Sequence, residues 1–284
     1  LEGARFQIGA RTTSDLSKKV RITGYLAYGT KDQAFKGGGT MEFNFGRQPT
    51  RKLTFDYKRD ALQLGKGDNA FSEGNFFSSV FSKENNQKLN YVNEGKIVYE
   101  HEVREGINLN FSIETKRVSD SEYVPMFSPD STRISSVKSA SIHAIGRFSW
   151  DEAVNRGYFN KTYLYTKYPI IYLDFSYVPN KVFSHNYGYT RIEAKVVYNL
   201  SIPPIGTSYI DISGGKIFGK VPYPLLKIHE GNGTYFFDPQ AFACMKYYEF
   251  SSDQWVQLFY SHNFKGFFLG KIPLFKRLKW REVV

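Results

Sequence analysis

The amino-acid sequence predicts an all-β protein, specifically an antiparallel transmembrane β-barrel of which about 12 strands are visible. Three observations predict this fold. Apolar and polar residues alternate with a period of two, short and long connections alternate along the chain, and Tyr and Phe recur near the ends of the predicted strands. Outer-membrane barrels combine these features, with apolar side chains facing lipid and polar side chains lining the interior.

The period-two alternation is the clearest of the three signals. It holds at every position from 107 to 114, and from 191 to 202 only Val197 breaks it. Because successive side chains of a strand point to opposite faces, each predicted strand has one apolar face and one strongly polar face.

The predicted strands follow one another along the whole chain, and several have about 9–12 residues, the length that a tilted strand needs to cross a bilayer. In chain order they are 4–13, 19–30, 38–46, 52–64, 96–103, 107–118, 139–149, 170–178, 188–202, 207–214 and 252–264, and a twelfth begins near 279. Most connections alternate between short turns and long segments, so we expect short turns at one end of the sheet and long loops at the other. The segments 150–169 and 265–278 are exceptions, because they are long although they lie at the end with the short turns.

A soluble antiparallel sandwich or barrel also alternates apolar and polar residues, with its apolar face inward. Two further features favour the membrane barrel: the polar face carries both charge signs, and connections of about 20–35 residues are uncommon in a sandwich. The alternatives differ in where the aliphatic side chains point, toward a packed interior or outward as a belt. Since a sheet edge in lipid leaves backbone groups without partners, we expect the intact barrel to have additional strands.

The composition excludes several classes of protein. One Cys and 17% aromatic residues exclude a disulfide scaffold, a Cys-cluster metal site and a disordered chain. No Pro-rich linker divides the chain and it does not start with Met, so we interpret residues 1–284 as one domain trimmed at both ends. The net charge of +11 comes from dispersed basic residues, so nucleic-acid binding is not expected. One basic, aromatic cluster at 271–281 is typical of a stretch near lipid headgroups.

Charged residues fall on the polar faces of the predicted strands. In a barrel they would form an interior network in which each charge is paired or hydrated. The candidate interior charges are Glu42, Asp56, Glu114, Arg191, Glu193 and Lys195.

Catalytic and cofactor chemistry is not predicted. The five histidines occur singly, without the spacing of metal ligands. Cys244 is interpreted as an inert buried thiol, and no Ser–His constellation for a lipase-like barrel can be identified. The segment 214–220 contains glycines and lysines but lacks the phosphate-loop pattern. We therefore expect a non-enzymatic protein with no metal and no cofactor.

Four stretches near the C-terminus carry a family resemblance: 214–226, which begins Gly214-Gly215-Lys216, then 229–239, 248–253 and 263–274. They resemble the C-terminal barrel of a Bacteroidota outer-membrane family of unknown function, in which a carboxypeptidase-regulatory-like domain precedes the barrel. The resemblance is strongest from 190 to 284, and departs at Ala243-Cys244-Met245, where an Asn-Leu-Met-like run is expected. More remotely, this barrel is similar to the surface-antigen superfamily, which includes outer-membrane insertases.

The resemblance implies a location in the outer membrane of a Gram-negative bacterium and a barrel of roughly 16 strands. It implies outer-membrane lipid as a partner, together with a polypeptide client or an accessory outer-membrane protein, and a role in polypeptide translocation or outer-membrane assembly. It also implies that the long segment 215–251 folds into the interior. The candidate interior loop residues are Gly214, Gly215, Lys216, Gly219 and Lys220.

Two other functions stay open at this point. A small-solute porin predicts an open interior and ion conductance. A soluble β-rich binding module predicts solubility without detergent.

Overall fold

The computed structural model describes residues 3–62, 89–121, 124–180, 187–232, 238 and 240–284. Eleven strands form one sheet in which all hydrogen-bonded neighbours are antiparallel and the spatial order follows the chain. These strands are β1 (Arg5–Arg11), β2 (Val20–Gly29), β3 (Phe35–Arg47), β4 (Thr50–Leu62), β5 (Asn90–Arg104), β6 (Ile107–Ser119), β9 (Ser136–Phe148), β12 (Ile170–Val178), β13 (Tyr189–Ile202), β14 (Gly206–Phe218) and β17 (Gln254–Asn263).

Smaller elements are inserted in the connections. Three small two-stranded antiparallel sheets pair β7 (Met126–Phe127) with β8 (Arg133–Ile134), β10 (Ala153–Arg156) with β11 (Lys161–Tyr165), and β15 (Lys227–Ile228) with β16 (Ser251–Ser252). The helical turns are η1 (Tyr223–Leu225), η2 (Leu269–Lys271) and α2 (Pro273–Arg277). Across the described ranges, every helix is too short or too polar to span a membrane.

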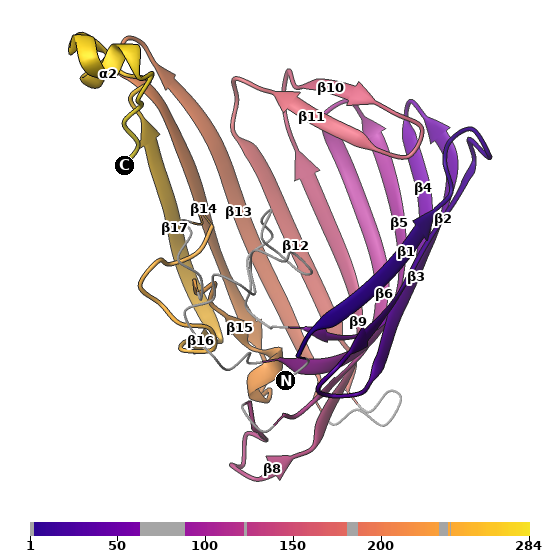
Figure 1. The fold of residues 1–284 in the computed structure, drawn as a ribbon. Coiled ribbons are helices and arrows are strands. Elements are labelled where there is room, and N and C mark those ends of the chain that lie inside the picture. Colours follow the sequence, from indigo (N-terminus) through magenta and orange to yellow (C-terminus); the bar gives the residue numbers. More distant parts are fainter. Residues whose placement is uncertain (1–2, 63–88, 122–123, 181–186, 233–237, 239) are drawn as a thin grey trace.

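Figure 1 shows the sheet curved into a trough, with β1 along one edge and β17 along the other. Within the described part of the chain these two strands do not pair with each other, so the sheet is open. Among the described residues, the free side of β17 is paired only near the end of the strand, where Val283 forms an antiparallel bridge with Asn263.

Each of the eleven sheet strands overlaps a strand predicted from the alternation. The predicted twelfth strand near 279 is wrong at that position. Helix α2, which Pro273 begins, ends at Arg277, Lys279 has a φ of +55° that is incompatible with a strand, and pairing with β17 starts only at Val283.

The two faces of the sheet differ sharply in chemistry and exposure. The outer, convex face carries the apolar belt, which we define by one residue from each strand, with exposures from 37% at Val196 to 76% at Ile8. The belt residues are Ile8, Leu26, Met41, Phe55, Ile97, Phe111, Ile142, Phe175, Val196, Ile212 and Leu258. Phe111 is 49% exposed, whereas the next residue, Ser112, points to the concave face and is 6% exposed.

The concave face, called the polar face below, carries the charged and hydroxyl side chains. On this face, residues that lie opposite one another on neighbouring strands are polar. An example is the series Asp56, Lys96 and Glu114 on β4, β5 and β6. Buried apolar side chains form only small clusters near the end with the long connections. The larger cluster joins Val92, Val118, Met126 and Val137, and Leu225 packs against it.

Candidate functional site: a charged interior surface and the hairpin that covers it

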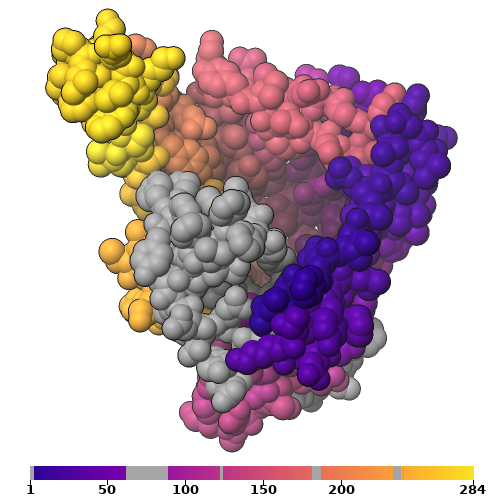
Figure 2. Space-filling model, in the orientation of Figure 1, coloured from indigo at the N-terminus to yellow at the C-terminus, as the bar shows by residue number. Residues whose placement is uncertain are grey.

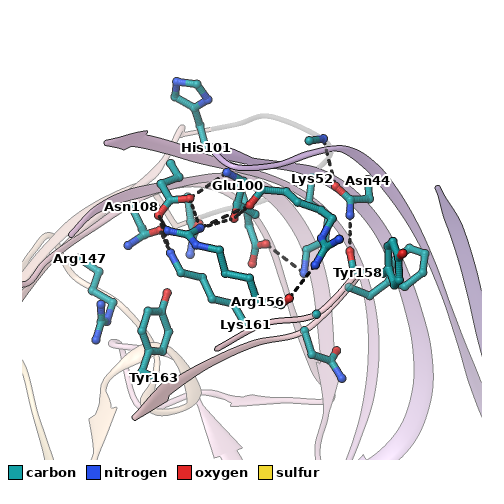
Figure 3. Close-up of a pocket in the computed structure, with 18 of the residues that line it drawn as sticks. Asn44, Lys52, Glu100, His101, Asn108, Arg147, Arg156, Tyr158, Lys161 and Tyr163 are labelled. Atoms are coloured by element: carbon teal, nitrogen blue, oxygen red, sulfur yellow. Dashed lines mark hydrogen bonds and ion pairs between the residues drawn. The ribbon is translucent and has the colours of Figure 1, made fainter. Parts of the chain in front are cut away.

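The hairpin β10–β11 lies across the polar face at the end with the short turns (Figure 3). It belongs to the segment 150–169, whose length is exceptional for that end. Its turn is closed by a hydrogen bond from Gly157 N to Asn160 O of 2.8 Å. At the tip, Arg21 Nη1 donates to Asn160 Oδ1 over 2.8 Å, and Asn44 donates to the carbonyl of Tyr158. The hairpin therefore reaches from β9 to β2 and β3 on the far side of the trough.

Glu102 of β5 holds the middle of the hairpin. Its carboxylate accepts hydrogen bonds from Arg156 Nη1 and Nη2 at 2.6 and 2.8 Å, and from Lys161 Nζ at 2.7 Å. The backbone N–H of Thr50 adds a fourth at 2.8 Å, and the Glu102 side chain is only 1% exposed. Such charge-assisted, bidentate contacts are the strongest that side chains make. The hydrogen bonds to Glu102 raise the pKa of the Arg156 guanidinium.

Arg147 of β9 anchors the base of the hairpin. Its guanidinium forms two hydrogen bonds with Glu152, of 2.7 and 2.6 Å, and lies 3.7 Å from the centre of the Tyr163 ring. Burial raises the pKa of the Tyr163 hydroxyl. The guanidinium is thus held by an ion pair in its plane and by a ring on its face.

Between the hairpin and the sheet lies a cavity of about 180 Å³. Figure 3 shows Arg156 and Lys161 reaching into this space from the hairpin, toward Asn108 on β6. Lys161 Nζ donates to Asn108 Oδ1 over 3.0 Å, while Asn108 Nδ2 is buried without a hydrogen-bond partner. The wall of the cavity therefore offers cations, carboxylates, amides and aromatic rings.

All six candidate interior charges lie on the polar face, and each has a polar partner. Glu42 pairs with Arg21 and with Lys52, Asp56 accepts a hydrogen bond of 2.5 Å from Thr40, and Glu114 lies 3.8 Å from Lys96. Arg191 pairs with Glu193, and Lys195 lies 2.8 Å from Asp211. They are spread along the trough rather than gathered in one pocket. The closest association with a cavity is that of Glu193 and Lys195, which line a second hollow near Gln240.

The candidate interior loop residues need correction. Gly214, Gly215 and Lys216 lie inside β14, paired with strands on both sides, so the prediction that they form a loop is wrong. Gly215 is glycine because the Trp255 ring approaches it: an added Cβ would lie 2.5 Å from that ring. The glycine pair thus reflects close packing within a strand, and not a turn.

Lys216 points to the outer face, where its ammonium lies 5.4 Å from the centre of the Phe218 ring. The strand ends at Gly219, whose φ of +133° suits glycine, and Lys220 is exposed. Within the described residues neither lysine pairs with a carboxylate.

The described part of the segment beyond Lys220 contacts the polar face. His229 Nδ1 lies 3.4 Å from Gln257 Oε1 on β17, and the rings of Phe242 and Phe259 are 4.8 Å apart. Tyr248 donates a hydrogen bond of 3.0 Å to Asn90 Oδ1 on β5, across the trough. Residues 233–237 and 239 lie outside the described residues. Burial raises the pKa of Tyr223 in η1 to about 12.

Sequence reasoning missed the hairpin cations, Glu102 and a buried serine–histidine chain. Ser141 Oγ lies 2.7 Å from His143 Nε2, and His143 Nδ1 lies 2.7 Å from Ser176 Oγ. The register that places His143 beside Ser176 was the missing information. Ser141 and Ser176 are 6% and 2% exposed, and this chain of hydrogen bonds joins β9 to β12. Cys244 is exposed, which corrects the prediction of a buried thiol.

Comparison with known proteins gives one match. Residues 1–123 and 125–284 match the family model described as the C-terminal domain of a family of unknown function, DUF5686. No curated protein and no solved structure matches the chain.

Proposed function

We propose that this chain, which belongs to the DUF5686 C-terminal domain family, is a membrane-spanning β-barrel domain of the outer membrane of a Gram-negative bacterium. In this proposal the domain is non-enzymatic, and its polar interior handles a polypeptide client during translocation or outer-membrane assembly. The membrane part and the client part rest on different observations.

The membrane assignment is carried by the inverted burial of the two faces. All eleven strands expose aliphatic or aromatic side chains on the convex face, while Glu42, Asp211 and other charged residues are less than 10% exposed on the concave face. A soluble sheet places its apolar face against a core, because burial of apolar surface is what drives folding. Here the apolar surface has no covering layer among the described residues, and acyl chains are the solvent that suits it.

The client assignment is supported by the contents of the interior. Cations and carboxylates alternate and are paired, and the hairpin together with the described parts of 221–252 lies over the polar face. Figure 2 shows the hollow of the trough with the hairpin along its rim. An interior filled in this way does not favour free diffusion of small solutes.

The membrane proposal is tested by placing labels on the two faces. In a Cys244→Ala background, Phe111→Cys and Val196→Cys put a single thiol on the apolar belt, while Asn110→Cys and Asn199→Cys put one on the polar face. The protein is reconstituted into vesicles, labelled with an environment-sensitive fluorophore and exposed to quenchers attached to acyl chains. We expect quenching at the two belt positions and little at the two control positions. Equal quenching in both pairs would refute the membrane assignment.

A further inference from the structure

A row of cations crosses the outer face at the end with the long connections. Arg59 of β4 lies opposite Asn93 of β5, Asn93 lies opposite Arg117 of β6, and Arg117 lies opposite Lys138 of β9. We call these four residues the cation row. Since neighbouring strands lie about 4.8 Å apart, the backbones of Arg59 and Arg117 are roughly 10 Å apart.

The three cations of the row are exposed and, within the described part of the chain, unpaired. Arg59, Arg117 and Lys138 all lie in the exposed class. Across the described residues none of them takes part in an ion pair, whereas the cations of the polar face are largely paired. The registered positions on either side of the row carry no carboxylate. On one side are Tyr57, Gly95, Thr115 and Ala140, and on the other are Ala61, Tyr91, Ser119 and Ser136.

Like charges directly opposite each other in a sheet are destabilising. Arg117 and Lys138 are such a pair, and Arg59 adds a third charge two strands away. An anion that binds the row would convert this repulsion into charge-assisted hydrogen bonds, and guanidinium groups match the geometry of phosphate oxygens.

The position of the row identifies the anion. Going toward the middle of the strands, Phe55, Ile97 and Ile142 of the belt lie four residues from the row on β4, β5 and β9, and Ile113 lies four residues from it on β6. Four residues of a strand span about 13 Å, so the row lies about 13 Å along the strands from these apolar side chains, beyond the edge of the belt. A lipid whose acyl chains cover the belt would place its phosphate at the row.

We infer that the cation row binds the phosphate groups of lipid headgroups in the leaflet at the end with the long connections. This inference rests on the membrane assignment made above. The inference goes beyond the membrane assignment by naming the class of lipid and the residues that select this class. The small side chains of Gly95, Thr115 and Ala140, between the row and the belt, leave space for the linkage between phosphate and acyl chains.

The test compares two lipids that differ only in the phosphate. The full chain in detergent is incubated with dipalmitoyl phosphatidic acid or with dipalmitoyl glycerol, and retained lipid is counted by native mass spectrometry. We expect preferential retention of phosphatidic acid, weakened by salt. In the variant R59A/R117A/K138A, the preference for phosphatidic acid over dipalmitoyl glycerol should fall roughly fivefold for each cation removed. The variant K31A/R104A/K167A removes three exposed cations outside the row and should keep it.

The outcomes separate the two proposals. Equal retention of both lipids by the wild-type chain, or an unchanged preference in the row variant, would overturn the phosphate inference and leave the belt intact. If neither lipid is retained, the membrane assignment fails, and the inference fails with it. Retention of dipalmitoyl glycerol by the row variant serves as the check that its apolar belt is folded.

Discussion

Arg156 and Glu102 lie 54 residues apart in the chain and form a bidentate ion pair, with N···O distances of 2.6 and 2.8 Å. This pair fastens the inserted hairpin β10–β11 to β5. The hairpin is the only inserted element, among the described residues, with cations that share one buried carboxylate. The attachment of the hairpin therefore decides whether the polar face is covered at the end with the short turns.

Glu102→Gln should release the hairpin. Removing one partner of a buried ion pair leaves the other charges uncompensated, so we expect the free energy of hairpin opening to fall by roughly 3 kcal/mol. Hydrogen exchange of residues 153–165 measures this directly. Glu105→Gln is the matched control, because Glu105 is 77% exposed and lies 3.7 Å from the same Arg156. Its effect should stay within about 0.5 kcal/mol. Equal protection of the hairpin in wild type and in the Glu102 variant would refute the anchoring role.

Replacing residues 153–165 with a short Gly-Ser turn should raise conductance in planar bilayers. The proposed function places the hairpin in the path of solutes, so the wild-type chain should be nearly silent and the deletion variant should conduct. High conductance of the wild-type chain would instead favour a small-solute porin. The Glu102→Gln variant should lie between these two proteins.

Gly215→Ala should destabilise the sheet next to Trp255. The new Cβ would lie 2.5 Å from the Trp255 ring and 2.7 Å from the carbonyl oxygen of Ile192, and that backbone atom has little freedom to move. We expect a loss of roughly 1–3 kcal/mol in the free energy of unfolding, measured by denaturant titration of Trp fluorescence. Gly24→Ala is the control, since its nearest neighbour would be Gly38 O at 3.7 Å. A similar loss in both variants would point to strand propensity rather than to the contact with Trp255.

The stability conferred by Asp32 should disappear in acid. Burial alone raises the pKa of Asp32, but hydrogen bonds from Lys36 and Tyr91 outweigh it and hold the pKa below its ordinary value of 3.8. A lowered pKa in the folded state means that the contribution is present above pH 3.8 and is lost as pH falls through the folded value. Asp32→Asn should therefore destabilise the protein at pH 7 and have a much smaller effect near pH 2. Unfolding titrations of both proteins at the two pH values check this, and a pH-independent difference would contradict it.

The alternation of residues was sufficient to locate the strands, because a strand with one polar and one apolar face has apolar and polar residues at alternate positions in the sequence. It was not sufficient where a strand contains glycine for packing. Gly214 and Gly215 are typical of a turn, and only the position of Trp255 on β17 explains why the strand continues through them. At the end of the chain the alternation also failed, because Lys279 has a φ of +55° where a strand was expected and pairing with β17 begins only at Val283.

By itself, the sequence determined the eleven strands of the sheet and the polar and apolar faces, since both follow from local periodicity. The tertiary structure alone decided which side chains meet. The pair Arg156–Glu102, the chain Ser141–His143–Ser176 and the cation row depend on strand register, and a shift of one residue moves every side chain of a strand to the opposite face. Register is set by contacts between segments that are distant in the chain, so no local pattern contains it.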